Sequence, residues 1–268
     1  MTLTNIMVAV DLGEPAHDRV RLAARLADDF HARLIGVAAE MPDYSWAPAG
    51  PTPGGVYGAP SIREEVLKDL TRAHARFRDA AGACDRIEWR STLDFPLPFL
   101  IAQAAAADLV VVGGRGGGAS ALAVDPGDAL MSLGRPVLVV PPGIDHVGAQ
   151  RIVVGWKDTR EARRAVSDAL PFLKRAAEVI IVSVEDTAGG DGQDTLRLLQ
   201  AHSVHAIRVR RDAQGASVAR ALVEAAAEHG ADLIVTGGYG HGRLREWTFG
   251  GVSRDLLAGA PICCLMSH

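Results

Sequence analysis

The feature that most constrains this fold is one short motif that occurs twice. Residues 107–118 read ADLVVVGGRGGG, and residues 231–242 read ADLIVTGGYGHG. In each copy an apolar run leads directly into a glycine-rich loop, and Gly113 and Gly237 are 124 positions apart. A continuous apolar run is typical of a strand buried on both faces of a parallel sheet. Glycine lets backbone amides approach a ligand closely, so the motif also has the features of an anion site.

The elements around the motif follow the same order in both halves of the chain. Apolar strands begin near Ile6 and Ile152, and alternating helical and strand patterns follow each of them. These first strands are 146 residues apart, whereas the glycine loops are 124 residues apart. The difference of 22 residues is close to the length of a Pro/Gly-rich stretch at residues 41–61, which occurs only in the first half. The sequence therefore predicts a tandem duplication with domains at residues 1–143 and 150–268. The insertion at 41–61 is expected to be a long loop, either a functional lid or a disordered segment.

Five alternations of strand and helix in each copy predict an α/β fold. We expect two tandem, doubly wound, Rossmann-like parallel sheets with right-handed crossovers. Ligands of such sheets bind at the carboxyl ends of the strands, beside the point where strand order reverses. The first and fourth strands flank that point, and the fourth strand carries the glycine loop.

Charge and composition argue against several classes of partner. The formal net charge is −4 at pH 7, the isoelectric point is near 6.1 and 5% of residues are aromatic. These values are unlike those of a nucleic-acid-binding surface or of a protein drawn to an anionic membrane. No apolar run approaches the roughly 18 residues of a membrane span, and the start of the sequence lacks a signal-peptide pattern. We expect a cytoplasmic protein with neither partner.

Motifs of familiar enzyme chemistries are missing from the sequence. It has no G-x-x-x-x-G-K-[ST] loop, no G-x-S-x-G nucleophile elbow and no zinc-ligand spacing. Cys84, Cys263 and Cys264 also lack metal spacing, and neighbouring strand residues face opposite sides, so buried free thiols are expected. The sequence predicts a protein that is not an enzyme.

The second glycine loop carries a resemblance to a known family. Gly237-x-x-Gly240 is followed by nine residues and then by Gly250. This resembles the universal stress protein A family, whose nucleotide-binding members have G-x-x-G, nine residues, and then Gly followed by Ser or Thr. Gly251 stands at that last position here, and Ser253 or Thr248 is near enough to replace the hydroxyl. The resemblance implies an adenine nucleotide alpha hydrolase-like fold with five-stranded sheets of order 3-2-1-4-5.

The first glycine loop departs further from the family pattern. Pro126 stands where the later glycine is expected, and proline has no N–H to offer a phosphate. We interpret this loop as degenerate. The family also has an Asp at the end of its first strand, near the adenosine. The first copy keeps it as Asp11, whereas the second has Lys157 followed by Asp158.

The remaining site candidates each have two interpretations. Lys157 either neutralises a phosphate or is a solvated residue at a strand end. Arg243 and Arg245 either clamp phosphates or pair with surface acids. Val184 matches the adenine-pocket position of the family, or is simply a core valine. The candidate cofactor-binding residues are Gly237, Gly240, Gly250, Gly251, Ser253, Lys157, Asp158, Val184, Arg243 and Arg245.

The resemblance implies a cytoplasmic stress-response protein without catalytic activity. Its second domain would bind ATP or a related adenine nucleotide, with magnesium. The alternative is a nucleotide-free interaction or scaffold protein in which both sites have decayed, and a third hypothesis is a slow ATP hydrolase. Family members pair through their last strands, which implies an internal pseudo-dimer between residues 136–140 and 261–266. The resemblance also implies a homodimer.

Overall fold

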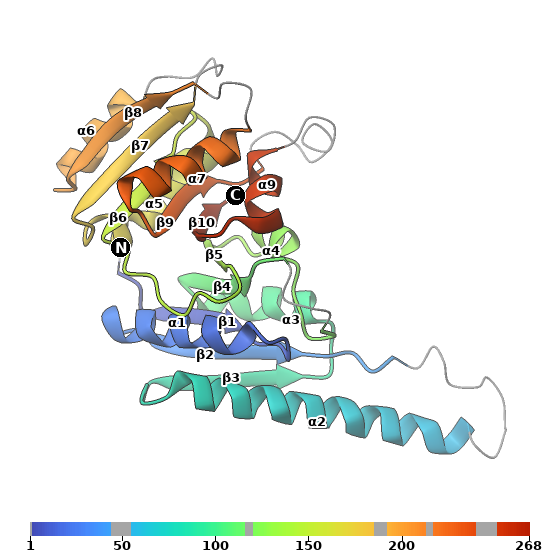
Figure 1. The fold of residues 1–268 in the computed structure, drawn as a ribbon. Coiled ribbons are helices and arrows are strands. Elements are labelled where there is room, and N and C mark those ends of the chain that lie inside the picture. The colour runs from blue at the N-terminus through green and yellow to red at the C-terminus, as the bar shows by residue number, and fades with distance from the viewer. Residues whose placement is uncertain (1, 44–54, 116–119, 185–191, 213–216, 240–250) are drawn as a thin grey trace.

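The ten strands of the protein form one continuous sheet (Figure 1). The computed structural model describes residues 2–43, 55–115, 120–184, 192–212, 217–239 and 251–268. The strand order is β3-β2-β1-β4-β5-β10-β9-β6-β7-β8. The strands are β1 (Asn5–Ala9), β2 (Arg33–Ala39), β3 (Ile87–Thr92), β4 (Leu109–Gly113), β5 (Val137–Val140), β6 (Arg151–Gly155), β7 (Glu178–Val184), β8 (Ala206–Arg211), β9 (Leu233–Gly237) and β10 (Cys263–Ser267).

The order of the first five strands is the predicted 3-2-1-4-5, and the last five strands repeat it in mirror order. We refer to β1–β5 with their helices as the first repeat and to β6–β10 with theirs as the second repeat. Ile6 pairs with Leu109 in the first repeat, and Ile152 pairs with Leu233 in the second. The equal register shows that the offsets of 146 and 124 residues relate equivalent positions.

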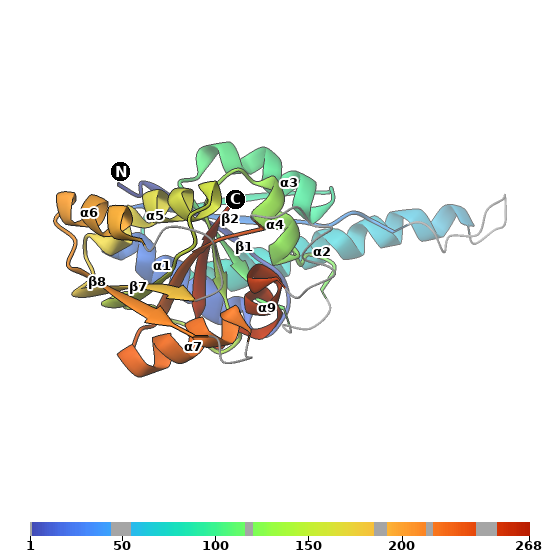
Figure 2. The ribbon, with the colours of Figure 1, turned by 90° about the horizontal axis from the view of Figure 1, so that it is seen from above.

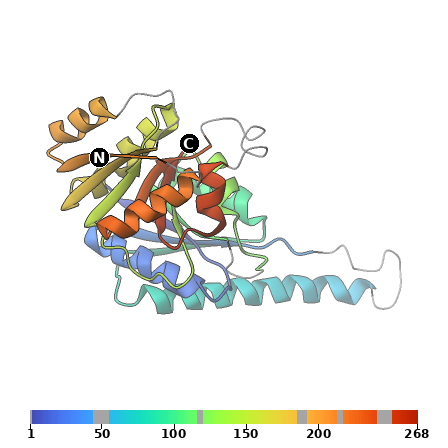
Figure 3. The same cartoon turned by 45° about the horizontal axis from the view of Figure 1, so that its top comes forward.

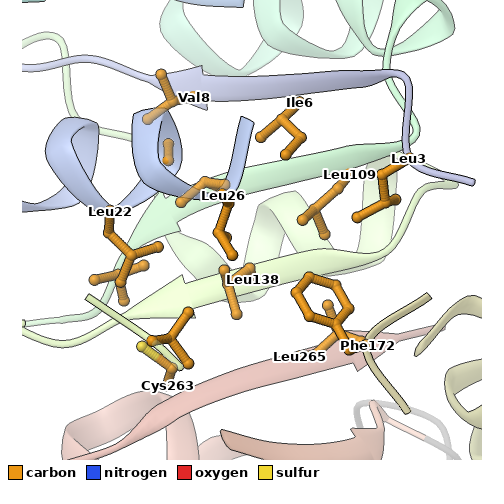
Figure 4. Close-up of a cluster of buried hydrophobic side chains, with 14 of the residues drawn as sticks. Leu3, Ile6, Val8, Leu22, Leu26, Leu109, Leu138, Phe172, Cys263 and Leu265 are labelled. Atoms are coloured by element: carbon orange, nitrogen blue, oxygen red, sulfur yellow. The ribbon is translucent and has the colours of Figure 1, made fainter. Parts of the chain in front are cut away.

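The two repeats meet through their last strands, as the family resemblance implies. β5 and β10 are antiparallel, with Leu138 opposite Leu265, whereas all other neighbouring strands are parallel. Figure 4 shows both leucines in one apolar cluster with Phe172. Cys84, Cys263 and Cys264 are free and buried, as expected. Burial raises the pKa of Cys263 and of Cys264 to about 12.

Helices cover both faces of the sheet, which explains the continuous apolar runs of its strands. One core lies under α1, α2, α5 and α6, and the other lies under α3, α4, α7 and α9. In Figure 2, α5 and α7 lie on opposite sides of the sheet, and Figure 3 shows the same layers at an angle. The helices are α1 (Ala16–Asp29), α2 (Gly55–Ala81), α3 (Pro96–Gln103), α4 (Pro126–Ser132), α5 (Arg160–Leu173), α6 (Gln193–Ala201), α7 (Val218–His229) and α9 (Val252–Gly259), with a 3-10 turn at Ala104–Ala106.

The secondary structure of the insertion in the first repeat differs from the predicted loop. Residues 41–61 were expected to be loop, but α2 begins at Gly55 and includes Pro60. Proline removes one helical hydrogen bond, and the rest of a long helix outweighs that loss. In Figure 2, α2 extends well beyond the body of the molecule. None of the described helices is long and apolar enough to cross a membrane.

Candidate functional site

Each repeat has a cavity at the carboxyl ends of its first and fourth strands. The cavity of the first repeat measures about 250 Å³ and lies at the ends of β1 and β4. The cavity of the second repeat measures about 160 Å³ and lies at the ends of β6, β7 and β9. Both occupy the place where strand order reverses, which is where the sequence predicts a ligand.

An arginine fills part of the cavity of the first repeat. The buried side chain of Arg19, on α1, donates from Nε to the Ala9 carbonyl oxygen (3.0 Å) and from Nη2 to Asp11 Oδ2 (2.7 Å). A Cβ atom added to Gly113 would collide with Nη1 of Arg19. The guanidinium therefore lies over the end of β4 and neutralises Asp11 from within the chain.

The helix that follows β4 is capped by its own carboxylate. Asp125 Oδ1 accepts from the backbone N–H groups of Gly127 (2.8 Å) and Asp128 (3.1 Å) at the start of α4. Pro126 has no N–H, and Arg115 Nη2 lies 2.9 Å from Asp125 Oδ2. The donors that would hold a phosphate here already hold Asp125.

The second repeat lacks the arginine. Ala165 stands 146 positions after Arg19, and Lys157 stands 146 positions after Asp11. The start of α5 lies close to β9 instead, since a Cβ atom on Gly237 would lie 2.6 Å from the backbone nitrogen of Ala162. Gly237, predicted as a ligand-binding residue, is therefore also required for this helix–strand contact.

The N-cap residue of α9, the described helix after β9, provides no side-chain cap. Gly251 is its N-cap residue, with φ −81° and ψ 140°, and it contributes no side-chain acceptor to the first turn of α9. Ser253 lies in that turn, is 2% exposed, and its Oγ accepts from the backbone N–H of Tyr239 (2.9 Å). Its hydroxyl proton is still available as a donor. The N-terminus of α9 thus differs from that of α4, where Asp125 takes the capping position.

The other predicted site residues are divided between two cavities. Lys157, Val184, Gly237 and Ser253 line the cavity of the second repeat. Asp158 does not, because it lines a different cavity and accepts from Arg163 Nε through Oδ1 (2.9 Å). Gly240, Arg243, Arg245 and Gly250 lie outside the described residues.

Sequence reasoning missed two buried charged residues at these cavities. Glu161 is 3% exposed and lines the cavity of the second repeat. Burial acts to raise the pKa of Glu161, but hydrogen bonds from Arg160, its own backbone N–H and Thr159 outweigh burial, so its pKa is lowered. Arg19 had a visible signal, because it lies four residues before Ala23 on the apolar stripe of its helix.

The glycine loop of the second repeat reaches the first repeat. Tyr239 directly precedes the part of the loop that the structure leaves undescribed, and its φ is +52°. A Cβ atom added to Gly127, on α4 of the first repeat, would lie 2.8 Å from the Tyr239 hydroxyl. Tyr239, just after β9, therefore lies against the start of the helix after β4.

Comparisons with known proteins agree with this geometry. The sequence profile of the universal stress protein family matches residues 2–141 and 190–268. A universal stress protein from Archaeoglobus fulgidus DSM 4304 is structurally similar over 98% of this chain and 95% of its own, with a TM-score of 0.66 and 17% identity. A putative universal stress protein from Pseudomonas aeruginosa UCBPP-PA14 covers 99% and 93%, with a TM-score of 0.53 and 13% identity. No curated protein sequence matches the chain.

Proposed function

Because this chain belongs to the universal stress protein family, we propose that it is a stress-response protein that binds ATP or a related adenine nucleotide in its second repeat, without catalysing a reaction. One observation carries the proposal. The N-terminus of α9 has no acceptor from its N-cap residue, whereas the N-terminus of α4 is occupied by Asp125. A helix N-terminus with free amide groups and its dipole attracts phosphate.

The lining of the second cavity fits this ligand. Val184 and the β6 end present an apolar wall for the base, Lys157 is placed to meet an anionic group, and Ser253 lies in the first turn of α9. The cavity of the first repeat is larger, but its polar groups are paired within the chain, since Arg19 is bonded to Asp11 and Asp125 caps α4. The proposal therefore assigns one nucleotide to each chain.

Magnesium would accompany the phosphates rather than occupy a protein site. The described residues contain no group of three or more His, Cys, Asp or Glu side chains that could hold a metal ion. The nearest buried carboxyl group, Glu161, is already hydrogen-bonded to Arg160. We therefore assign no magnesium ligand to the protein.

Two variants at Gly251 test the proposal. Its backbone angles suit any residue, so Gly251→Asp would copy the Asp125 cap onto α9, and Gly251→Ser would add only a neutral hydroxyl. Both variants should fold, because Gly, Ser and Asp are all favourable N-cap residues. With saturating Mg·ATP, we expect a rise in Tm for the wild type and Gly251→Ser that is largely lost in Gly251→Asp. No rise in any of the three proteins would contradict the proposal.

The second candidate function is a nucleotide-free interaction protein. Two contacts favour it: Gly237 packs against α5, and Ser253 Oγ already accepts from Tyr239. It predicts that ATP leaves all three melting temperatures unchanged. The third hypothesis, slow ATP hydrolysis, requires phosphate release above the level of a protein-free blank, and we expect none.

We further propose a cytoplasmic homodimer. Free thiols at all three cysteines suit a reducing compartment. The dimer must use a surface other than the last strands, because β5 and β10 already pair within the chain. Light scattering at micromolar concentration should give twice the chain mass of 28.2 kDa.

A further inference from the structure

A buried indole beside β6 has no hydrogen-bond partner. Trp156 follows the last residue of β6 and is 8% exposed, and its Nε1–H meets no acceptor among the described residues. Leaving such a donor unsatisfied costs about 1–3 kcal/mol. Orphaned buried donors are rare in native proteins, and each calls for a physical explanation.

The N-terminus of α6 lies next to this indole. Its N-cap residue, Gly192, has φ +75° and ψ 10° and contributes no side-chain acceptor. A Cβ atom on Gly192 would lie 3.1 Å from Cδ1 and 3.5 Å from Nε1 of Trp156, so glycine permits both the left-handed turn and the close approach. The indole N–H of Trp156 therefore lies near the first backbone N–H groups of α6, a nine-residue helix. The N-cap residue, Gly192, provides no side-chain acceptor for these donors.

A cavity of about 410 Å³ adjoins these donors, between α5 and α6. This volume is within the range of small-molecule sites. Trp156, Val166 and Leu198 form its apolar wall, and Thr195 lies among the polar groups. It is lined by residues of α5 and α6, whereas the lining of the proposed nucleotide cavity also includes Leu222 of α7 and Ser253 of α9.

The charged side chains of this cavity are paired. Arg163 is held by Asp158, with Nη2 and Oδ1 2.9 Å apart, and Asp194 is held by Arg197, with Nη1 and Oδ1 3.0 Å apart. The described lining thus offers no uncompensated cation for a multiply charged phosphate. Its donors suit one carboxylate, and its wall suits an apolar body.

We propose that this cavity binds a small organic acid with an apolar body. A carboxylate oxygen accepts from Trp156 Nε1 and faces the start of α6, while the apolar body packs against Val166 and Leu198. This cavity adjoins the proposed nucleotide cavity, because Trp156 lines both. The proposal does not rest on the proposed nucleotide binding.

Tryptophan indole resonances of the ¹⁵N-labelled full chain test the proposal in the absence of nucleotide. The Trp156 resonance is assigned by its loss in Trp156→Phe, and octanoate is the probe. We expect octanoate to shift this resonance saturably, and octanol to bind more weakly. An indole resonance that stays in place at millimolar octanoate, or equal binding of octanol, would overturn the proposal.

Three variants complete the test, with octanoate affinity measured by calorimetry. Trp156→Phe keeps an aromatic side chain but removes the indole N–H together with the five-membered ring, so affinity should fall about fivefold. Leu198 is 49% exposed, so Leu198→Asp should fold and should also weaken binding by placing a like charge beside the acid. Trp89→Phe is the matched control, because Trp89 Nε1 already donates to Ser91 Oγ (3.1 Å). Unchanged affinity in Trp156→Phe would overturn the proposal.

Discussion

Arg19 is the residue that most clearly separates the two repeats. Its guanidinium lines the cavity of the first repeat, and its partner Asp11 is the acid that the family resemblance assigns to the nucleotide. In the second repeat Ala165 and Lys157 stand at these two positions. The acid at the end of the first strand is therefore paired with a cation of the chain itself in one repeat and is replaced by a lysine in the other.

The Arg19–Asp11 pair should contribute strongly to stability. Both side chains are largely buried, at 5% and 16% exposure, so Arg19→Met leaves a buried carboxylate without its cation. We expect the free energy of unfolding to fall by about 3 kcal/mol. Urea unfolding at pH 7 measures the loss. Adding Asp11→Asn should recover part of it, and a loss well below 1 kcal/mol in Arg19→Met would contradict the assignment.

Asp108 and Asp232 explain part of the repeated ADL sequence in structural terms. Asp108 Oδ2 accepts from the backbone N–H groups of Thr4 (2.8 Å) and Asn5 (3.0 Å), just before β1 and at its start. Asp232 Oδ2 accepts from the equivalent segment before β6, at Ala149 N (3.1 Å). Each aspartate ties the start of the fourth strand of its repeat to the start of the first, so this part of the motif maintains strand pairing.

The role of Asp108 predicts an acid-dependent contribution to stability. Burial acts to raise the pKa of Asp108, but hydrogen bonds from Thr4 and Asn5 and the charge of Arg135 outweigh burial and lower it. With the folded pKa below the unfolded value of about 3.9, the contribution is complete above that value and is lost as the pH falls through the folded pKa.

Asp108→Asn should therefore be less stable than wild type by about 1–2 kcal/mol at pH 7. The difference should shrink as the pH falls below about 4. Urea unfolding at pH 7 and at pH 3 measures both quantities. A difference that stays constant between the two pH values would show that the carboxylate charge is not responsible.

At the scale of elements, the two helix N-termini that follow the fourth strands differ in their N-cap residues, and the proposed function rests on this difference. The starts of α4 and α9 follow equivalent strands, yet Asp125 caps one and Gly251 stands at the N-cap of the other. Helix geometry leaves the first N–H groups without partners inside each helix. A single N-cap residue therefore determines whether those groups serve the fold or a ligand.

The junction between β5 and β10 is the element contact that unites the repeats. Leu138 and Leu265 are opposite each other and fully buried (Figure 4). We expect Leu138→Ala and Leu265→Ala each to cost about 3 kcal/mol. Because the two side chains are opposite each other in the sheet, the loss in free energy of unfolding of the double variant should differ from the sum of the losses of the two single variants. Urea unfolding tests this, and strict additivity would contradict coupling across the junction.

At the scale of the molecule, the continuous sheet brings the two repeats into contact. The antiparallel junction relates the repeats, and Tyr239 of the second repeat reaches Gly127 at the capped helix of the first. On the proposed function, we expect a change at the start of α4 to affect nucleotide binding in the second repeat through Tyr239.

Gly127→Ala, a change on α4 of the first repeat, tests whether the contact with Tyr239 affects nucleotide binding in the second repeat. The added methyl group would lie 2.8 Å from the Tyr239 hydroxyl and 3.0 Å from Asp125 Oδ1, so the Tyr239 side chain must move. On the proposed function, we expect the affinity for ATP to fall about threefold, a size typical of coupling between sites. Gly259→Ala is the matched control, because its Cβ would meet no atom within 4 Å and its φ is not positive. Equal affinity in both variants would show that the contact carries no coupling.

The sequence by itself determined the repeated architecture. Its apolar runs, such as the one that ends at Gly113, belong to strands covered on both faces, and local pattern is enough to show this. The offsets of 124 and 146 residues related equivalent strands correctly, and the family resemblance supplied the strand order and the junction. The predicted start of α2 was wrong. Proline content is a local signal, whereas the extent of a helix depends on the stability of the whole helix.

Only the tertiary structure decided how the site residues are used. Asp11 is a plausible ligand residue in the sequence, but Arg19, eight positions later, turns back onto it through the packing of α1. Asp158 follows Lys157 directly and yet lines a different cavity. The indole N–H of Trp156 has no partner among the described residues, although the start of α6, from a distant segment, lies beside it. Strand periodicity is encoded locally, whereas the partner of each polar group is set by elements that meet only in the folded chain.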